Sequence, residues 1–300
     1  MSDAAKPADK PNPPHGAPGH VHPEPLAEEV VEAFEEVGQF SLHVIVGTLI
    51  AVVAYFGEIM SLFGETLRTV FRRGINTSDL VRQMAVIGVE SLPIALLTVG
   101  FSSAVLALYT ITSLKNYGAT DIVGGITAIA VMRETGPLLT GISIAARAGS
   151  AITAEIGSMK VSEQIDALRS MAISPIEYLV APRLLASLVM FPLMTVLSNV
   201  AGVAGGAIVA GANGVAFSAF QGGIAQFLNQ DGSDITKGLL KTVFFGAIVA
   251  LVGCREGMNT EGGATGVGRS TTRSVVISIV LIFVADFVLT FLLFTNKGGF

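Results

Sequence analysis

Residues 160–171 read KVSEQIDALRSM and lie between two long apolar runs, IVGGITAIAVMRETGPLLTGISIAA at 122–146 and LLASLVMFPLMTVLSNVAGVAGGAIVAGA at 184–212. Each apolar run exceeds the roughly 20 residues that a helix needs to cross a bilayer. The segment between them mixes acidic, basic and apolar side chains. We expect a membrane protein with such a segment between two spans to contact a partner there.

The composition of the chain places it among integral membrane proteins. Hydrophobic residues make up 51% of the 300 residues and charged residues only 14%, which is typical of a chain with several membrane spans. We therefore predict an all-α integral membrane protein without a large soluble domain. The single cysteine, Cys254, excludes a disulfide framework and a metal site built from cysteines.

Five segments are predicted to span the membrane: 84–112, 122–146, 184–212, 238–254 and 274–294. The region before the first span begins with acidic residues, continues with an apolar stretch at 42–56 and ends with basic residues near residue 73. A helix of about 15 residues covers only about 22 Å, less than the ~30 Å hydrocarbon core. We therefore expect an interfacial or re-entrant amphipathic helix over residues 28–75, after a disordered tail at 1–27 that is rich in proline and histidine.

Basic residues are distributed unevenly between the two sides of these spans. One side holds only Lys115, Lys237 and Lys297. The other side holds eleven basic residues: Arg68, Arg72, Arg73, Arg82, Arg147, Lys160, Arg169, Arg183, Arg255, Arg269 and Arg273. The positive-inside rule therefore places residues 160–171 in the cytoplasm and the carboxyl terminus outside.

Residues 160–171 also have the pattern of a short amphipathic helix of about 12 residues. An apolar stripe recurs at the helical period: Val161, Ile165, Leu168 and Ala172. The opposite face is polar: Lys160, Glu163, Gln164, Asp166 and Arg169. Membrane-surface helices favour basic residues on the polar face, whereas this face has both signs of charge. We interpret it as a surface for another protein; the alternative is a loop helix that lies at the interface without a partner.

A second group of charges lies inside the predicted spans. Arg133 and Glu134 interrupt the second span, Lys241 the fourth and Asp286 the fifth. Each charge costs at least about 2.5–3.5 kcal/mol at mid-membrane unless it is paired or hydrated. We therefore expect Glu134, Lys241 and Asp286 to meet, either as a structural ion cluster or as part of a transport cycle. Glu90, in the first span, is a further candidate.

Small residues repeat along the third span. Gly202, Gly206, Ala210 and Gly214 are spaced four residues apart, and such faces let helix backbones approach closely. This pattern predicts tight packing inside the protein and requires no dimer.

The sequence lacks a site for ATP. Gly263, Gly268, Arg269 and Ser270 approximate a phosphate-binding loop, but arginine replaces the essential lysine and no apolar strand precedes the loop. Any ATP hydrolysis is therefore expected in a partner chain. We predict no catalytic residue, metal or cofactor in this one.

Several motifs follow one another in a recognisable order. They are RETGP at 133–137, ARAGSAITAEIG at 146–157, Glu163-Gln164, Ser174-Pro175, TTR at 271–273 and DFVLT at 286–290. In sequence and spacing these motifs closely resemble the MlaE/YrbE family of ABC-transporter permeases. The resemblance covers about residues 80–295 and delimits a permease domain at 80–296.

This resemblance implies a homodimeric permease in the bacterial inner membrane. It implies ABC ATPase subunits beneath the permease, an MCE-domain protein on the periplasmic side and, in some systems, a STAS-domain protein. The cargo would be phospholipid or a related lipid. The polar face at 160–169 would form the coupling helix that contacts the ATPase. Glu134, Lys241 and Asp286 match the family's charged membrane residues, and Leu106 and Tyr117 match lipid-pocket positions. Glu90 falls where related sequences vary, so the resemblance implies no role for it.

The main alternative is an ion-coupled secondary transporter or channel with Glu134, Lys241 and Asp286 as its ion path. Inverted repeats would support that class, and the sequence shows none. The mixed-charge helix at 160–171 would also have no purpose in such a transporter. A lipid-modifying enzyme is a third possibility, but the sequence offers neither a nucleophile nor a metal set for it.

Overall fold

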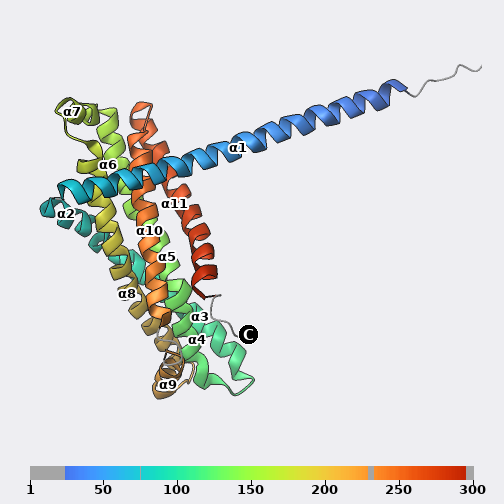
Figure 1. Ribbon diagram of the computed structural model, residues 1–300. Helices are drawn as coiled ribbons and strands as arrows, with labels where there is room; N and C mark the ends of the chain where they lie inside the picture. The colour runs from blue at the N-terminus through green and yellow to red at the C-terminus, as the bar shows by residue number, and fades with distance from the viewer. Residues whose placement is uncertain (1–23, 75, 229–232, 295–300) are drawn as a thin grey trace, which may run out of the picture. The chain divides into compact units, whose positions relative to one another are not determined.

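The computed structural model describes residues 24–74, 76–228 and 233–294 and divides into two units, residues 1–56 and 57–300. Every regular element in the described ranges is a helix (Figure 1). These ranges include six helices that are long and apolar enough to cross a membrane. The prediction of an all-α integral membrane protein is confirmed.

Helix α1 (Glu24–Arg73) is continuous and begins within the predicted tail, whose first 23 residues lie outside the described ones. From the sequence alone, residues 42–56 are an apolar stretch too short to span the membrane. In the structure the helix continues through Glu58, and Ile50–Arg72 has the length and hydropathy of a span. Length and composition therefore give six candidate spans where five were predicted, and the interfacial placement of this helix stays a prediction.

The five predicted spans are all present, and each is longer than its apolar run. They are Thr77–Lys115, Thr120–Val161, Ile176–Ala212, Ser233–Met258 and Gly263–Phe294. The first contains α2 (Thr77–Ile87), η1 (Val89–Ser91) and α3 (Leu92–Lys115). The second contains η2 (Thr120–Ile122), α4 (Val123–Ala130), η3 (Val131–Thr135), α5 (Gly136–Ile144), η4 (Ala145–Gly149) and α6 (Ser150–Val161). The last three consist of η5 (Ile176–Val180) with α8 (Ala181–Ala212), then α10 (Ser233–Met258), then α11 (Gly263–Phe294).

Small residues let α8 pack closely against its neighbours, as predicted. A Cβ atom added at Gly202 would lie 2.8 Å from the Ser103 hydroxyl of α3, and one at Gly206 would lie 2.8 Å from the Thr127 side chain of α4. Gly214 does not belong to this packed face. It follows the end of α8 with a φ of +88° and has no neighbour within 4 Å, so it serves the turn that ends the helix.

Helix α9 (Phe217–Leu228) was not predicted from the sequence. It lies against α4 so closely that a Cβ atom at Gly124 would be 2.0 Å from the carbonyl oxygen of Phe220. The Phe220 side chain is buried and forms a small core with Ile111, Val123, Ala210 and Val215. With 12 residues, α9 is too short to give the signal of a membrane span.

Large apolar side chains also point outward from α3 and α11. Phe101 is 70% exposed and Phe287 is 74% exposed, and they have many apolar neighbours on the same two helices. Water-exposed surfaces rarely hold contiguous apolar patches of this kind. This face is therefore suited to lipid or to another membrane helix.

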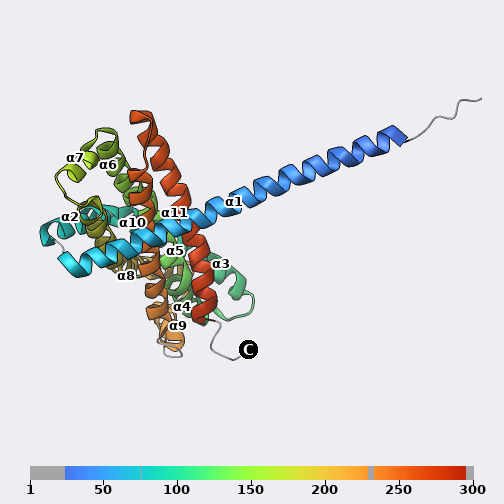
Figure 2. The ribbon, with the colours of Figure 1, turned by 45° about the horizontal axis from the view of Figure 1, so that its top comes forward.

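The helices of residues 57–300 end at two opposite faces of the bundle (Figures 1 and 2). Helix α7 (Gln164–Ser170), the end of α6 and the start of α11 lie at one of them, here named the α7 end. Helix α9 and the end of α11 lie at the opposite one, the α9 end. Two of the loops that the distribution of basic residues assigned to one side, the one that contains residues 160–171 and the one between α10 and α11, thus lie together at the α7 end.

Candidate functional site

The three intramembrane charges expected to meet do so. The Lys241 ammonium donates to both carboxylate oxygens of Glu134, each at 2.8 Å, and to Asp286 Oδ1 at 3.1 Å. The Lys241 side chain is fully buried, whereas those of Asp286 and Glu134 are 13% and 41% exposed. One lysine therefore joins the second, fourth and fifth predicted spans.

The local backbone explains how Lys241 reaches Glu134. Glu134 lies in η3, a π-helical turn that is wider than a normal helical turn and is common at functional sites. Gly238, one turn before Lys241, faces η3, and a Cβ atom there would lie 2.1 Å from the Met132 carbonyl oxygen. The backbones of α10 and η3 are therefore in direct contact, and the lysine also donates to the Arg133 carbonyl oxygen at 3.1 Å.

Residues around the cluster add contacts that the sequence did not predict. Thr290 donates from its hydroxyl to Glu134 at 3.1 Å. Arg133 pairs with the buried Asp234 at 2.7 Å, and the Phe294 ring lies 5.1 Å from the Arg133 guanidinium and 5.4 Å from the Lys241 ammonium. Cations at this distance from an aromatic face are attracted to it.

Glu90, a candidate from its charge alone to which the family resemblance gave no role, does not join this cluster. It pairs instead with Arg147 of η4. Arg147 also donates to the Val86 carbonyl oxygen at 2.7 Å. The pair therefore fixes the start of α3 against the second span at a separate place.

The polar residues of the predicted coupling surface lie around α7. Glu163, Gln164, Asp166 and Arg169 are exposed and Lys160 is half-buried. The Asp166 carboxylate accepts from Lys160 at 3.2 Å and from Arg169 at 3.0 Å. Because Lys160 belongs to the last turn of α6, this pair ties α7 to the end of the second span.

The predicted single helix of about 12 residues is wrong in extent. Helix α6 ends at Val161, and α7 has only 7 residues. Between them Glu163 adopts a left-handed backbone with φ of 59°, which ends the helical path. Of the predicted apolar stripe, Ile165 is buried and Leu168 half-buried, whereas Val161 and Ala172 are exposed and outside α7.

Leu106 and Tyr117, the predicted lipid-pocket residues, lie toward the α9 end. Leu106 is half-buried on α3, and Tyr117, just after that helix, is 83% exposed. An apolar hollow of about 500 Å³ lies between α8 and α9, and neither residue lines it. Its walls include Val200, Ala204 and Phe217. The lipid role of Leu106 and Tyr117 stays a prediction.

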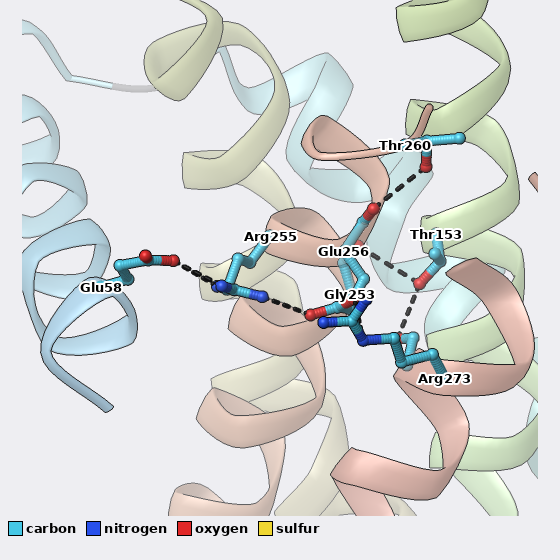
Figure 3. A network of polar contacts seen from close by, with 8 residues as sticks. Glu58, Thr153, Gly253, Arg255, Glu256, Thr260 and Arg273 are labelled. Carbon is cyan, nitrogen blue, oxygen red and sulfur yellow. Dashed lines mark hydrogen bonds and ion pairs between the residues drawn. The ribbon is translucent and has the colours of Figure 1, made fainter. Parts of the chain in front are cut away.

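A network of charges at the α7 end was also missed (Figure 3). Arg255 of α10 donates to Glu58 of α1 at 2.5 Å and to Glu256 at 2.5 Å. Glu256 is nearly buried and also faces Arg273 of α11 at 3.3 Å. These residues are far apart in the sequence and follow no recognisable motif. The sequence showed only that Arg255 and Arg273 lie on the side of the spans that is rich in basic residues.

Comparison with known proteins agrees with this arrangement. The family model described as Permease MlaE matches residues 80–292. The chain belongs to the MlaE permease family. Probable ABC transporter permease protein slr1045 of Synechocystis sp. is 39% identical, over 79% of this chain and 90% of the relative. Probable ABC transporter permease protein ycf63 of Porphyra purpurea is 40% identical, over 80% and 90%.

A plant relative is also similar to this permease. Protein TRIGALACTOSYLDIACYLGLYCEROL 1, chloroplastic, of Arabidopsis thaliana is 36% identical, over 78% of this chain and 67% of the relative. The family resemblance seen in the sequence is thereby confirmed. The chain is a multi-pass ABC transporter permease, a transport subunit rather than a catalytic enzyme, and such a permease works with an ATPase partner.

Proposed function

We propose that this permease moves phospholipid or a related lipid between the bacterial inner membrane and a periplasmic MCE-domain protein. Two copies of the permease would surround the lipid, and ATPase subunits would contact α7 from the cytoplasm. A STAS-domain protein could join the ATPase in some systems. The observation that supports this proposal most strongly is α7 itself, a short mixed-charge helix that projects at the basic end of an MlaE permease.

The contacts of α7 would allow it to transmit movement of the ATPase to the rest of the permease. Ile165 is 1% exposed and anchors the helix, while the Asp166 carboxylate binds Lys160 at the end of α6. The remaining polar groups face outward, where an ATPase surface would meet them. A push on α7 is therefore passed to α6 without first bending a flexible loop.

The second span can transmit this push to the buried charges. It is helical from Thr120 to Val161 and contains two π-helical turns, η4 and η3, of which η3 holds Glu134. Wide turns of this type are places where a helix can change its hydrogen bonding. In this mechanism, movement of α6 shifts Glu134 against Lys241 and Asp286 and so repositions α10 and α11.

A lipid cargo is supported by the apolar surfaces and by the relatives. The exposed apolar faces of α3 and α11 suit acyl chains, and one relative bears the name of a galactosylated diacylglycerol. In the homodimer the apolar faces of α3 and α11 would surround the lipid, and Leu106 and Tyr117 would lie near the outer end of the lipid-binding cavity. The permease would then pass the lipid to or from the MCE-domain protein.

The ion-coupled alternative is favoured by one observation, the partly exposed Glu134 next to the buried Lys241. Reconstitution into liposomes separates the two functions. With the ATPase present, we expect lipid movement that requires ATP and continues without any ion gradient. Substrate movement driven by an ion gradient in liposomes that contain the permease alone would contradict the proposal.

A further inference from the structure

A polar hollow of about 580 Å³ lies between the last turns of α1 and the segment that follows α7. Its α1 wall includes Ser61, Glu65, Arg68 and Arg72, which recur at the helical period and so share one face. Glu177 contributes to the opposite wall. A volume of this size is within the range of small-ligand sites.

The two arginines of this hollow are available to a ligand. Arg68 and Arg72 are exposed and lie one turn apart, and neither forms an ion pair with any residue in the part of the chain that the structure describes. A different face of α1, which contains Ile59 and Thr66, packs against the rest of the protein: Ile59 is 8% exposed and Thr66 is fully buried. The guanidinium groups therefore border the hollow without being used to hold α1 in place.

The surroundings of the hollow indicate a lipid environment. Phe71, next to Arg72, is 85% exposed, and Tyr178, next to Glu177, is 52% exposed. On the adjoining α2, Val81 is 64% exposed. Arg68 and Arg72 belong to the candidate span Ile50–Arg72, and Glu177 lies at the start of the span Ile176–Ala212, so the hollow borders two candidate membrane spans.

We propose that this hollow binds the head group of a phospholipid that contains both a phosphate and an amine. Arg68 and Arg72 would donate to the phosphate, because guanidinium groups match its oxygens in geometry and charge. Glu65, on the same face of α1, would accept from the ammonium. The presence of carboxylates in the lining disfavours an anion alone, and the exposed aromatic side chains would contact the acyl chains. This site rests on the proposed orientation, in which the α7 end faces the cytoplasm.

The site can be tested by photo-crosslinking in full-length permease purified in detergent. The probe is phosphatidylethanolamine with a photoreactive group near its head, and labelled peptides are identified by mass spectrometry. We expect labelling at residues 61–72 and 174–178. The double variant Arg68→Ala/Arg72→Ala should lower it about tenfold, as expected for the loss of charge-assisted hydrogen bonds. Arg82→Ala is the matched control, because Arg82 is an exposed arginine of α2 outside the hollow, and should leave labelling unchanged.

Competition identifies the ligand. Unlabelled phosphatidylethanolamine should suppress labelling, whereas inorganic phosphate and phosphatidylglycerol should not. Suppression by inorganic phosphate, equal competition by phosphatidylglycerol, or unchanged labelling in the double variant would each overturn the proposal.

A protein partner is the other possible occupant of the hollow. Loss of ATPase co-purification in the double variant, with lipid labelling intact, would assign the hollow to the ATPase and overturn the lipid site. Glu163→Lys distinguishes this result from failure of the transport proposal, because it should weaken ATPase binding and leave labelling of the hollow unchanged.

Discussion

Lys241 is the residue on which the buried charge cluster depends. Replacing it with methionine keeps most of its volume but leaves the carboxylates of Glu134 and Asp286 unpaired in the bundle. Loss of one partner from a buried ion pair costs about 3–5 kcal/mol. We expect Lys241→Met to lower the thermal unfolding temperature in detergent, whereas Lys237→Met, one turn away and half-buried, should have a small effect.

A triple variant separates the two roles considered for this cluster. Adding Glu134→Gln and Asp286→Asn to Lys241→Met removes the unpaired charges and should recover most of the lost stability. If the cluster takes part in transport, the recovered protein should still fail to move lipid. Full transport by a stable triple variant would show that the charges serve only to pack the helices.

Glu256 and Glu58 bind the same arginine but differ in burial. The Glu256 side chain is 4% exposed and that of Glu58 is 57% exposed. Exposed pairs contribute about 0–1 kcal/mol, whereas the loss of a buried partner costs several times more. We therefore expect Glu256→Gln to lower the free energy of unfolding clearly more than Glu58→Gln, as measured by denaturation in mixed micelles. Equal effects would show that burial of Glu256 does not strengthen the network.

The sequence predicted the central charge cluster because charges in a bilayer must find partners. It could not predict that Arg133 pairs with Asp234 or that Arg255 pairs with Glu58. Asp234 lies just before a predicted span and Glu58 just after the apolar stretch at 42–56, so neither charge was expected to need a partner, although Asp234 is buried in the structure. Only the folded chain shows which of several possible partners each arginine meets.

Helix contacts depend on a few glycines, and Gly238 shows this most clearly. A methyl group there would meet the Met132 carbonyl oxygen at 2.1 Å, which is backbone and cannot rotate away. We expect Gly238→Ala to separate α10 from η3, weaken the Lys241–Glu134 contact and reduce transport. Gly222→Ala on α9 is the matched control, because nothing lies within 4 Å of the added group. Normal transport by Gly238→Ala would mean that this backbone contact is dispensable.

Helix α7 is the element through which the permease is expected to receive work from the ATPase. Substitution of Glu163 tests this role most directly, because Glu163 is exposed and its side chain forms no ion pair with a described residue. Glu163→Lys should weaken ATPase co-purification and leave membrane insertion intact. Glu261→Lys, an exposed acid in the loop between α10 and α11, should retain the ATPase. Undiminished co-purification with Glu163→Lys would count against the coupling role of α7.

The elements themselves were predictable to different degrees. Long apolar runs gave the five spans because a backbone in lipid must satisfy its own hydrogen bonds. The break between α6 and α7 was not predictable, since it depends on a left-handed Glu163, a conformation that glycine or asparagine would have signalled and glutamate does not. Helix α9 was missed because packing on α4, rather than a span-length apolar run, stabilises it.

At the scale of the whole molecule, the described residues combine exposed apolar helix faces with several groups of charges, three of which bear on the proposed cycle. Glu134, Lys241 and Asp286 lie within the spans, Glu58 and the Arg255 network at the α7 end, and the polar residues of α7 beyond them. The second span connects the first and last of these places. In the proposed cycle this span is the path along which ATP-driven movement reaches the lipid-facing part of the protein.

Photo-crosslinking in intact cells from a photoreactive amino acid at position 163 tests the coupling by α7 most directly. The proposed arrangement predicts a product that joins the permease to an ATPase subunit, because Glu163 would lie in the cytoplasm at the ATPase surface. A photoreactive amino acid at Tyr117, exposed toward the α9 end, should give no such product. Crosslinks from position 163 only to proteins outside the cytoplasm, or to no protein, would contradict the account.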